Sequence, residues 1–240
     1  MDKNSMLYWW PLASLIDIPK PQTIIIWTGM SSLMNMLDGN PLPDYLKDFI
    51  LLGGRNIGYP LFLRTDLASG KHNWKDTCYV PSEDVLFRHV YGVVEENDMA
   101  GIIGLNYQAI VLRQFIPLEH SFTAFWGKMP VSKERRYFIR DGKVECHHPY
   151  WSEDAIATSD WSEEELIKVY NLPNNWRSLL ADLNHESKEE IKLLTDYAEQ
   201  LGKYLSGYWS LDFAKGQDGN WYFIDAALGE QSWHPEHGKS

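Results

Sequence analysis

The sequence has little cysteine, fewer basic than acidic residues and no long apolar run. Its two cysteines, Cys78 and Cys146, are too few for a disulfide scaffold and match no zinc spacing, so we expect reduced thiols and a cytoplasmic protein. With 22 basic against 33 acidic residues, the formal net charge is −11. The chain therefore lacks the basic surface that nucleic acids and anionic membranes attract. No apolar run approaches the roughly 20 residues of a membrane helix, so we expect no nucleic-acid partner and no membrane insertion.

The rest of the composition is that of an ordinary folded protein, with 44% hydrophobic and 23% charged residues among 240. A chain of this length forms one domain or two intimate lobes and buries a sizeable core. Apolar runs predict strands at residues 23–27, 61–63, 77–80, 109–117, 120–126, 135–140 and 144–148. Helical spacing predicts helices at residues 30–37, 43–53, 83–97 and 188–207. The last of these helices starts from a capping box at Ser187.

A predicted β-hairpin over residues 208–233 carries two aspartates on one face. Asp218-Gly219 favours a two-residue turn, because that turn requires positive φ and apolar runs flank it on both sides. With the turn at these two residues, Asp212 lies directly opposite Asp225. The other face of the hairpin is then apolar and faces a core, with Trp209, Leu211, Phe213, Tyr222, Ile224, Ala226 and Leu228.

Two aspartates that face each other repel, so something positive is expected between them. Carboxylate oxygens suit a hard cation such as Mg²⁺, which proteins hold through one or two carboxylates together with substrate phosphates. Glu230 follows the hairpin closely enough to be a third ligand. The candidate metal ligands are therefore Asp212, Asp225 and Glu230. The alternative is a shifted register in which both aspartates are solvated.

A second candidate site is the loop at residues 66–72. Small residues, Gly70 and Lys71 allow backbone amides and a cation to approach an anion. Arg64 ends the preceding apolar strand, where its charge is held in place. The spacing is not that of a Walker P-loop, so a surface loop with a solvated lysine is the alternative reading.

Two pairs of adjacent polar residues lie in the predicted strands that follow. Because side chains alternate along a strand, Arg135 and Arg136 should point to opposite faces, and one of them should face a site. His147 and His148 should also diverge, which argues against a shared metal site.

The order of these parts resembles the ATP-grasp superfamily, with the likeness running over residues 58–233. Within it, the chain is similar to the phage and bacterial clade named for two arginines and a lysine. A related likeness is to eukaryotic chaperones that assemble a translation initiation factor. The resemblance implies an α+β fold of two lobes with antiparallel sheets and ATP held between them, an N-terminal lobe at 1–116 and a C-terminal lobe at 117–240. It also implies ATP and Mg²⁺ as cofactors.

The resemblance assigns roles to individual residues. Arg64 and Lys71 look like the phosphate-contacting cations of the first lobe. The segment around Arg136 is similar to the chaperones' Glu-Phe-Arg motif, which implies a phosphate contact for Arg136. Asp212 and Asp225 fall where the family holds Mg²⁺. The family usually has an asparagine where this chain has Ala227, so Glu230 or Gln231 would have to supply the further ligand. Contacts to adenine and ribose are implied for Arg113, Gln114, Phe115, Ile116 and Glu119.

These features predict a ligase that joins a small-molecule or peptide carboxylate to an amine through an acyl phosphate. The alternative is an ATP- and Mg²⁺-binding assembly chaperone or protein-binding module without ligase turnover. A purely structural α+β protein without nucleotide is the third reading. The second reading needs exposed aromatic side chains, for which the candidates are Trp126, Tyr150, Trp151, Trp161 and Trp233.

Overall fold

The computed structural model describes residues 2–100, 106–157 and 162–234. The chain divides into two compact units. Unit 1 holds residues 1–20, 117–122 and 130–240, and unit 2 holds residues 21–116 and 123–129. The chain passes from unit 2 to unit 1 between Ile116 and Pro117.

Unit 2 contains a four-stranded antiparallel sheet in the order β1-β4-β2-β3. Its strands are β1 (Thr23–Trp27), β2 (Leu61–Thr65), β3 (Tyr79–Val80) and β4 (Ala109–Gln114). Its helices are α2 (Met30–Leu37), α3 (Asp44–Ile57) and α4 (Leu86–Ala100), with the short 3-10 turns η1 (Lys71–Asn73) and η2 (Glu83–Val85). The predicted strand at 23–27 and helix at 30–37 are confirmed residue by residue.

The core of unit 2 forms because alternate strand residues, such as Leu61 and Leu63, face the helices. Gly53-Gly54 was expected to weaken or end the second helix, and it does not end it, because α3 continues to Ile57. A Cβ on Gly53 would lie 2.8 Å from the Leu112 Cδ1 atom, so this glycine lets the helix approach the sheet closely. The glycine pair reflects packing rather than a helix end.

Unit 1 contains the sheet β10-β9-β7-β8, which is also antiparallel throughout. Its strands are β7 (Glu134–Arg140), β8 (Lys143–Pro149), β9 (Tyr208–Lys215) and β10 (Trp221–Leu228), and η4 (Gly229–Gln231) follows the last strand. Its helices are α1 (Met6–Ser14), α5 (Glu153–Ile156), α6 (Glu163–Tyr170), α7 (Trp176–Asn184) and α8 (Lys188–Gly202). A separate two-stranded sheet pairs β5 (His120–Ala124) with β6 (Met129–Ser132), and β6 was not predicted.

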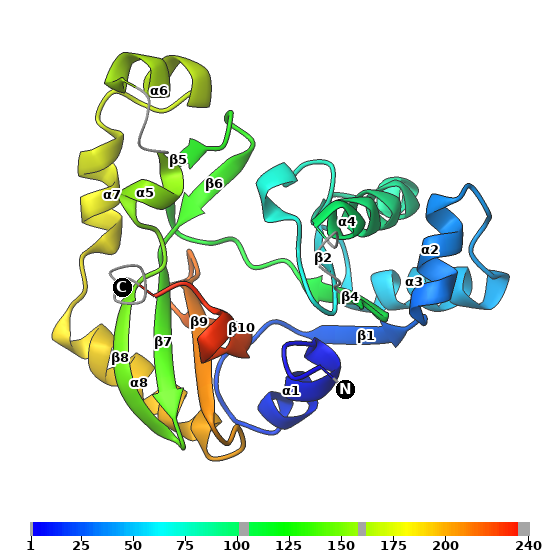
Figure 1. Ribbon diagram of the computed structural model, residues 1–240, viewed down its shortest axis with the longest axis horizontal. Coiled ribbons are helices and arrows are strands. Elements are labelled where there is room, and N and C mark those ends of the chain that lie inside the picture. The colour runs from blue at the N-terminus through cyan, green and yellow to red at the C-terminus, as the bar shows by residue number, and fades with distance from the viewer. Residues whose placement is uncertain (1, 101–105, 158–161, 235–240) are drawn as a thin grey trace. The chain divides into compact units, whose positions relative to one another are not determined.

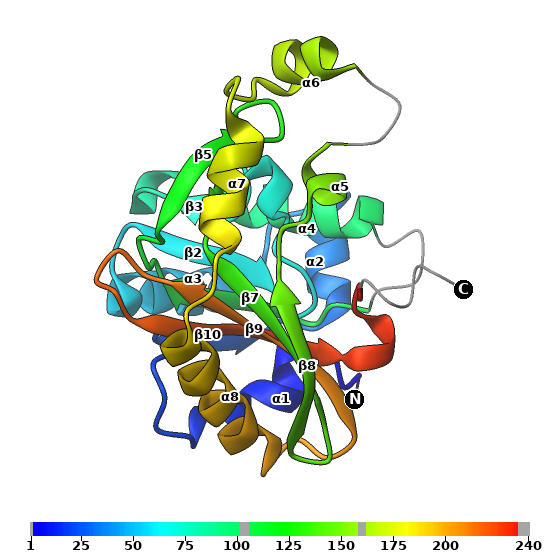
Figure 2. The same cartoon turned by 90° about the vertical axis from the view of Figure 1, so that its left-hand side faces the viewer.

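One face of the unit 1 sheet is buried under helices. The ring of Phe213 on β9 lies 6.4 Å from that of Tyr197 on α8, and the ring of Phe223 on β10 lies 5.6 Å from that of Trp9 on α1. Figure 2 shows α8 running along this sheet beside β7 and β8. Since side chains alternate, the opposite face is left for polar groups.

The capping box predicted for α8 is present. The Ser187 hydroxyl accepts a hydrogen bond from the Glu190 amide, and the Glu190 carboxylate accepts one from the Ser187 amide. The helix ends at Gly202, five residues before the predicted end at Gly207.

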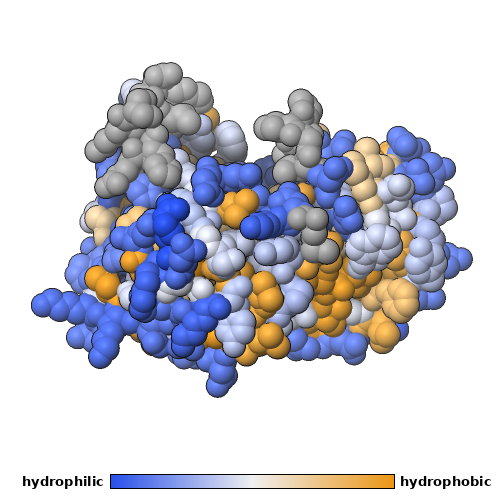
Figure 3. All heavy atoms as spheres, turned by 60° about the horizontal axis from the view of Figure 1, so that its bottom comes forward, coloured by the Kyte–Doolittle hydropathy of each residue, from blue (hydrophilic) through white to orange (hydrophobic). Residues whose placement is uncertain are grey.

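Unit 2 carries apolar side chains on its surface along α3 and at the end of β1. Trp27, Tyr45, Phe49 and Leu52 are 64%, 59%, 56% and 56% exposed. Figure 3 looks onto the side on which β1 lies and shows hydrophobic surface among hydrophilic surroundings. Among the described helices, none is long and apolar enough to cross a membrane.

Glu190 also stabilises unit 1 through its charge. Its Oε1 atom lies 2.9 Å from the Lys215 Nζ and 3.4 Å from the Lys133 Nζ. Burial opposes the charge, but hydrogen bonds from Lys215 and the Ser187 amide, with the attraction of both lysines, lower the pKa of Glu190 to about 2 from its ordinary 4.5. Because the folded-state pKa is depressed, this stabilisation is present above about pH 4.5 and is lost as the pH falls towards 2.

We therefore expect Glu190→Gln to lower the free energy of unfolding by about 1 kcal/mol at pH 7, since glutamine keeps the cap but loses both ion pairs. The difference from wild type should shrink between about pH 5 and pH 2, as urea unfolding at several pH values would measure. The exposed neighbour Glu189→Gln changes the net charge equally and is the control. A difference that stays constant with pH would rule out the charge as its source.

Candidate functional site

The hairpin of β9 and β10 places Asp212 directly opposite Asp225, as predicted. The turn and the register that lead to this pairing differ from the predicted ones. Trp221 pairs with Lys215, so the turn spans the five residues 216–220, and the predicted two-residue turn at Asp218-Gly219 is wrong. A bulge between Phe223 and Asp225 then shifts the register by one residue and restores the expected pairing.

The side chain of Asp218 explains the longer turn. It accepts hydrogen bonds from the Asn220 amide, from the Asn220 side chain and, at 2.7 Å, from the Tyr222 hydroxyl. The bulge also changes which side chains face the core. Phe223 is fully buried opposite Phe213, whereas Tyr222 and Ile224, which were predicted on that face, are only half-buried.

The positive charge expected at the aspartates is supplied by Arg136 of the neighbouring strand β7. Arg136 pairs in register with Asp212, and its Nε and Nη2 atoms donate to Oδ1 and Oδ2 of that carboxylate, both at 2.8 Å. The two side chains are 14% and 10% exposed. Burial disfavours the charged guanidinium, but attraction and hydrogen bonding to Asp212, with a contribution from Asp225, raise the pKa of Arg136. The Tyr150 ring centroid lies 4.6 Å from the guanidinium carbon.

Arg135 points to the opposite face, as the alternation predicted. It is fully buried, and its Nη2 atom donates to the Leu183 and His185 carbonyls at 3.1 and 2.9 Å. Its Nε atom lies 3.0 Å from the Glu186 carboxylate, and burial lowers the pKa of Arg135. This arginine ties the sheet to the end of α7 and to the chain that follows it.

The two histidines of β8 diverge in the same way. The Nδ1 atom of His147 lies 3.4 Å from the Glu186 carboxylate on the helix-covered face. His148 lies on the face of Arg136, and burial, Arg136 and His234 lower its pKa. The predicted divergence of the two side chains is confirmed.

The remaining predicted metal ligands differ in position. Asp225 Oδ1 accepts a hydrogen bond from the Ala226 amide at 3.1 Å. Glu230 lies in η4, where its charge acts on Arg140 and Tyr208. These two residues pair with each other, and Arg140 is four residues beyond Arg136 on β7. Within residues 2–100, 106–157 and 162–234, no group of three or more His, Cys, Asp or Glu side chains is arranged to hold a metal ion.

The facing carboxylates nevertheless fit a hard cation by their chemistry. Asp212 and Asp225 offer the oxygen donors that Mg²⁺ prefers, on the face of the sheet opposite the helices. In this structure Arg136 uses both Asp212 oxygens. A cation at this position would therefore either share the Asp212 carboxylate with the guanidinium or take its place.

The predicted phosphate-contacting residues of the first lobe lie in unit 2. Arg64 is 4% exposed, and its Nε atom donates to the Thr65 carbonyl at 3.0 Å. Gly70 adopts a left-handed conformation with φ of 60° directly before Lys71, which opens η1. Glu96 lies beside this glycine, and burial raises its pKa although Lys128 opposes the shift.

The segment predicted to contact the base runs along the end of β4 and beyond it. The Arg113 Nε atom donates to the Thr23 hydroxyl at 3.3 Å, and the Gln114 amide donates to the Gln22 carbonyl at 2.8 Å. Gln114 is exposed, whereas Ile116 is half-buried. In unit 1, the Glu119 amide donates to the Lys215 carbonyl at 2.8 Å, and the Glu119 side chain is exposed.

An aromatic cluster around Phe115 was not predicted. The Phe115 ring lies 5.1 Å from that of Tyr79 and 6.1 Å from that of Trp74, and Phe62 contacts Trp74 at 5.7 Å. The sequence contained one signal for this cluster. Phe62 and Arg64 are two residues apart in β2, so an aromatic side chain lies on the same face as the predicted phosphate contact.

The aromatic residues proposed for a protein interface have different fates. Trp126 and Trp233 are 57% and 49% exposed. Trp151 is 3% exposed and donates to Glu134 Oε1, so it is no longer a candidate for an exposed interface. Tyr150 is half-buried against Arg136, and Trp161 lies outside the described residues.

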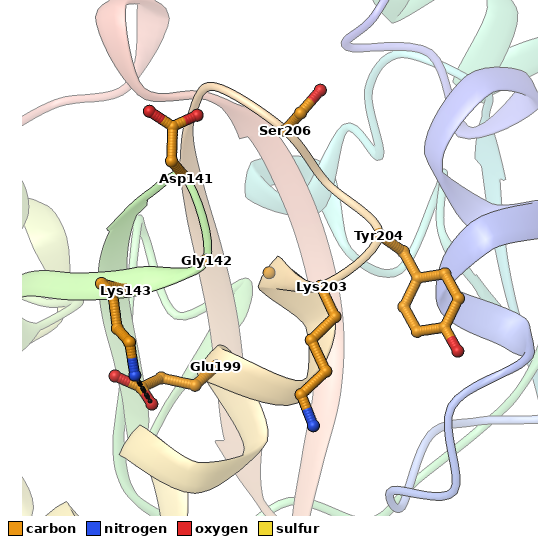
Figure 4. Close-up of a pocket in the computed structure, with 8 residues that line it drawn as sticks. Asp141, Gly142, Lys143, Glu199, Lys203, Tyr204 and Ser206 are labelled. Carbon is orange, nitrogen blue, oxygen red and sulfur yellow. Dashed lines mark hydrogen bonds and ion pairs between the residues drawn. The ribbon is translucent and has the colours of Figure 1, made fainter.

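A pocket of 440 Å³ lies at the far end of unit 1 (Figure 4). It is lined by the turn after β7 and the end of α8, and Lys143 in its wall pairs with Glu199 at 3.0 Å. Asp141 is five residues beyond Arg136, which corresponds to about 16 Å along an extended strand. The pocket is therefore separate from the Asp212 and Asp225 pair.

Comparison with known proteins gives a family and a fold. Residues 52–240 match the model of an ATP-grasp domain family, the third family of the clade named for two arginines and a lysine. No curated protein matches the sequence. The α+β ATP-grasp fold and the clade predicted from the sequence are confirmed by these findings.

Two solved structures show the likeness in fold. Cdc123 from Schizosaccharomyces pombe is similar with a TM-score of 0.56 and 12% identity over 94% of this chain and 83% of that chain. The VanG D-Ala:D-Ser ligase from Enterococcus faecalis is similar with a TM-score of 0.53 and 14% identity over 98% of this chain. The likeness covers 56% of the VanG chain.

Replacing Arg136 should expose the repulsion between the two aspartates. We expect Arg136→Met to lower the free energy of unfolding by about 3 kcal/mol, because Asp212 loses the partner of a buried ion pair. Millimolar Mg²⁺ should restore part of this loss, since the cation can take the place of the guanidinium, and should affect the wild type less. Urea unfolding with and without Mg²⁺ measures both effects.

The double variant with Arg136→Met and Asp225→Asn is the control for this experiment. It keeps Asp212 but lacks the second facing carboxylate, so Mg²⁺ should stabilise it much less than the single variant. An equal gain from Mg²⁺ in the single and double variants would show that the cation binds elsewhere.

Proposed function

Because this chain belongs to the ATP-grasp domains, in the third family of the clade named for two arginines and a lysine, we propose that it binds ATP with Mg²⁺ and ligates a carboxylate to an amine. The observation that carries the proposal is the triad of Asp212, Asp225 and Arg136 on the face of the unit 1 sheet opposite the helices. Two carboxylates and a guanidinium there match the two kinds of charge in a magnesium–phosphate complex.

Three cations would contact the phosphates. Arg64 and Lys71 come from unit 2, and Arg136 comes from unit 1. Arg64 and Arg136 are held by buried strands, which fixes their guanidinium groups and limits the entropy lost on binding. Their role would be to stabilise the negative charge of the transferring phosphoryl group.

Two facing carboxylates would hold the metal. Asp212 and Asp225 are the main ligands in this proposal, and Glu230 in η4 is the third candidate. Bound Mg²⁺ would neutralise phosphate charge and orient the γ-phosphoryl group. Binding would transfer Asp212 from Arg136 to the cation.

The base and ribose of ATP would lie along the chain that leaves β4. The Phe115 ring, supported by Trp74 and Tyr79, offers an apolar surface, and the backbone beyond β4 offers hydrogen-bond groups. The residues proposed for these contacts are Arg113, Gln114, Phe115, Ile116 and Glu119.

In the proposed reaction a substrate carboxylate attacks the γ-phosphorus of ATP and expels ADP, which leaves an acyl phosphate. An amine then attacks the acyl carbon, loses a proton and expels phosphate, so that an amide forms. Neither step requires a nucleophilic side chain of the protein, and the cations stabilise the departing groups. The substrates are a small-molecule or peptide carboxylate and amine, a pairing supported by the likeness of fold to VanG. A cysteine content too low for a disulfide scaffold supports a cytoplasmic location.

A second candidate function is an ATP- and Mg²⁺-binding module for a protein partner. The observation that favours it is the apolar surface of Trp27, Tyr45, Phe49 and Leu52 on unit 2. Exposed aromatic and aliphatic side chains of this kind mark protein interfaces. The two functions differ in whether ADP forms.

Thermal unfolding with ATP, Mg²⁺ or both tests the shared part of the two proposals. At about 100 times its dissociation constant, Mg²⁺-ATP should add roughly 2.7 kcal/mol to the stability of the wild type. Asp225→Asn should abolish most of this gain, because one facing carboxylate loses its charge. Asp154→Asn, on the exposed surface of α5, removes the same charge elsewhere and should leave the gain intact.

Release of ADP with panels of carboxylates and amines then separates the two functions. Turnover that requires both substrates supports the ligase, whereas binding without ADP supports the module. A wild type that millimolar Mg²⁺-ATP does not stabilise would contradict both.

A further inference from the structure

A short segment after β10 lies on the same face of the unit 1 sheet as Arg136. We call this segment, Ser232–His234, the C-terminal strap. The Ser232 and Ser210 hydroxyl oxygens are 2.5 Å apart, and Ser210 is 2% exposed on β9 two residues from Asp212. A hydrogen bond shielded from water in this way holds the strap firmly to the sheet.

The next two residues of the strap extend this contact. The His234 ring packs edge-on against Phe138 at 4.6 Å, and its Nε2 atom lies 3.0 Å from the Cys146 Sγ. His234 is 7% exposed. The Trp233 ring lies 5.3 Å from the His148 ring and perpendicular to it. The strap therefore contacts residues of β7, β8 and β9.

The strap also touches Arg136 directly. The Trp233 carbonyl accepts a long hydrogen bond of 3.5 Å from Arg136 Nη1, while Nε and Nη2 donate to Asp212. All three guanidinium nitrogens therefore have partners within unit 1, and the Tyr150 ring lies 4.6 Å from the guanidinium carbon. A bidentate contact between Arg136 and a phosphate needs at least two of these nitrogens.

We propose that the strap is an internal competitor of the nucleotide: while the Trp233 carbonyl occupies Nη1, phosphate oxygens cannot bind the edge of the guanidinium formed by Nη1 and Nη2. The inference rests on the proposed function, because it takes Arg136 to be a phosphate contact. When only a fraction of the molecules is in the binding-competent state, the apparent affinity for the ligand equals the intrinsic affinity multiplied by that fraction. Loosening the strap should therefore tighten ATP binding.

The two cysteines provide a reporter for the position of the strap. Cys146 lies beneath His234, whereas Cys78 in unit 2 is fully buried and burial raises its pKa to about 12. A thiol reagent such as N-ethylmaleimide should therefore label Cys146 in preference to Cys78. The labelling rate of Cys146, followed by mass spectrometry in a Cys78→Ser background, measures release of the strap.

Ser232→Ala tests the proposal, because it removes the bond to Ser210 without altering a residue assigned to ATP or Mg²⁺. We expect Cys146 to be labelled several-fold faster and the Kd for Mg²⁺-ATP to fall several-fold. Mg²⁺-ATP should also accelerate labelling of Cys146 in the protein with Ser232 intact. Trp233→Ala, which removes a half-exposed ring and keeps the carbonyl, should act in the same direction.

Ser206→Ala is the matched control, since this exposed serine in unit 1 lies before β9 and should change neither quantity. Faster labelling with an unchanged Kd in both strap variants would overturn the proposal, and so would Mg²⁺-ATP binding that leaves the labelling rate unchanged. If Mg²⁺-ATP stabilises none of these proteins, the proposed function itself fails. The two failures are thus distinguished by whether the nucleotide binds.

Discussion

The site depends on the repulsion between Asp212 and Asp225, which face each other across β9 and β10. A sheet does not retain two facing carboxylates without a counter-charge, because their repulsion opposes strand pairing. Arg136 supplies that charge from β7, with a bidentate contact to Asp212. The strand order β10-β9-β7 brings these three charges together from segments distant in sequence.

The separation of the two sheet faces allows this polar cluster to form. Helices cover one face, where Arg135 is fully buried and bonded to backbone carbonyls. Two adjacent residues of β7 therefore have different roles. Arg135 holds the end of α7 and the chain after it to the sheet, and Arg136 neutralises the charge of Asp212. The charged groups on the face of Asp212 can exchange partners without disturbing the core, because the side chains of the helix-covered face point away from Asp212.

The sequence predicted what depends on local rules and missed what depends on tertiary contacts. Alternation predicted the divergence of Arg135 and Arg136, and the pairing of Asp212 with Asp225 was also predicted. The predicted turn was wrong, and the pairing survived only because a bulge near Ile224 compensated for the longer turn. No local rule indicates that His234 packs against Cys146, because 88 residues separate them and the contact exists only in the folded sheet.

Under the proposed function, Arg136 and a metal ion would compete for the carboxylate of Asp212, and this competition would couple the binding of nucleotide and metal. A phosphate that draws Arg136 away leaves Asp212 available to a cation, and a cation on Asp212 leaves Arg136 available to phosphate. Each ligand then raises the affinity for the other by the same factor, as linkage requires. The ion pair that stabilises the sheet without ligands would in this way make nucleotide and metal bind together, and the strap on Arg136 would set how readily the exchange begins.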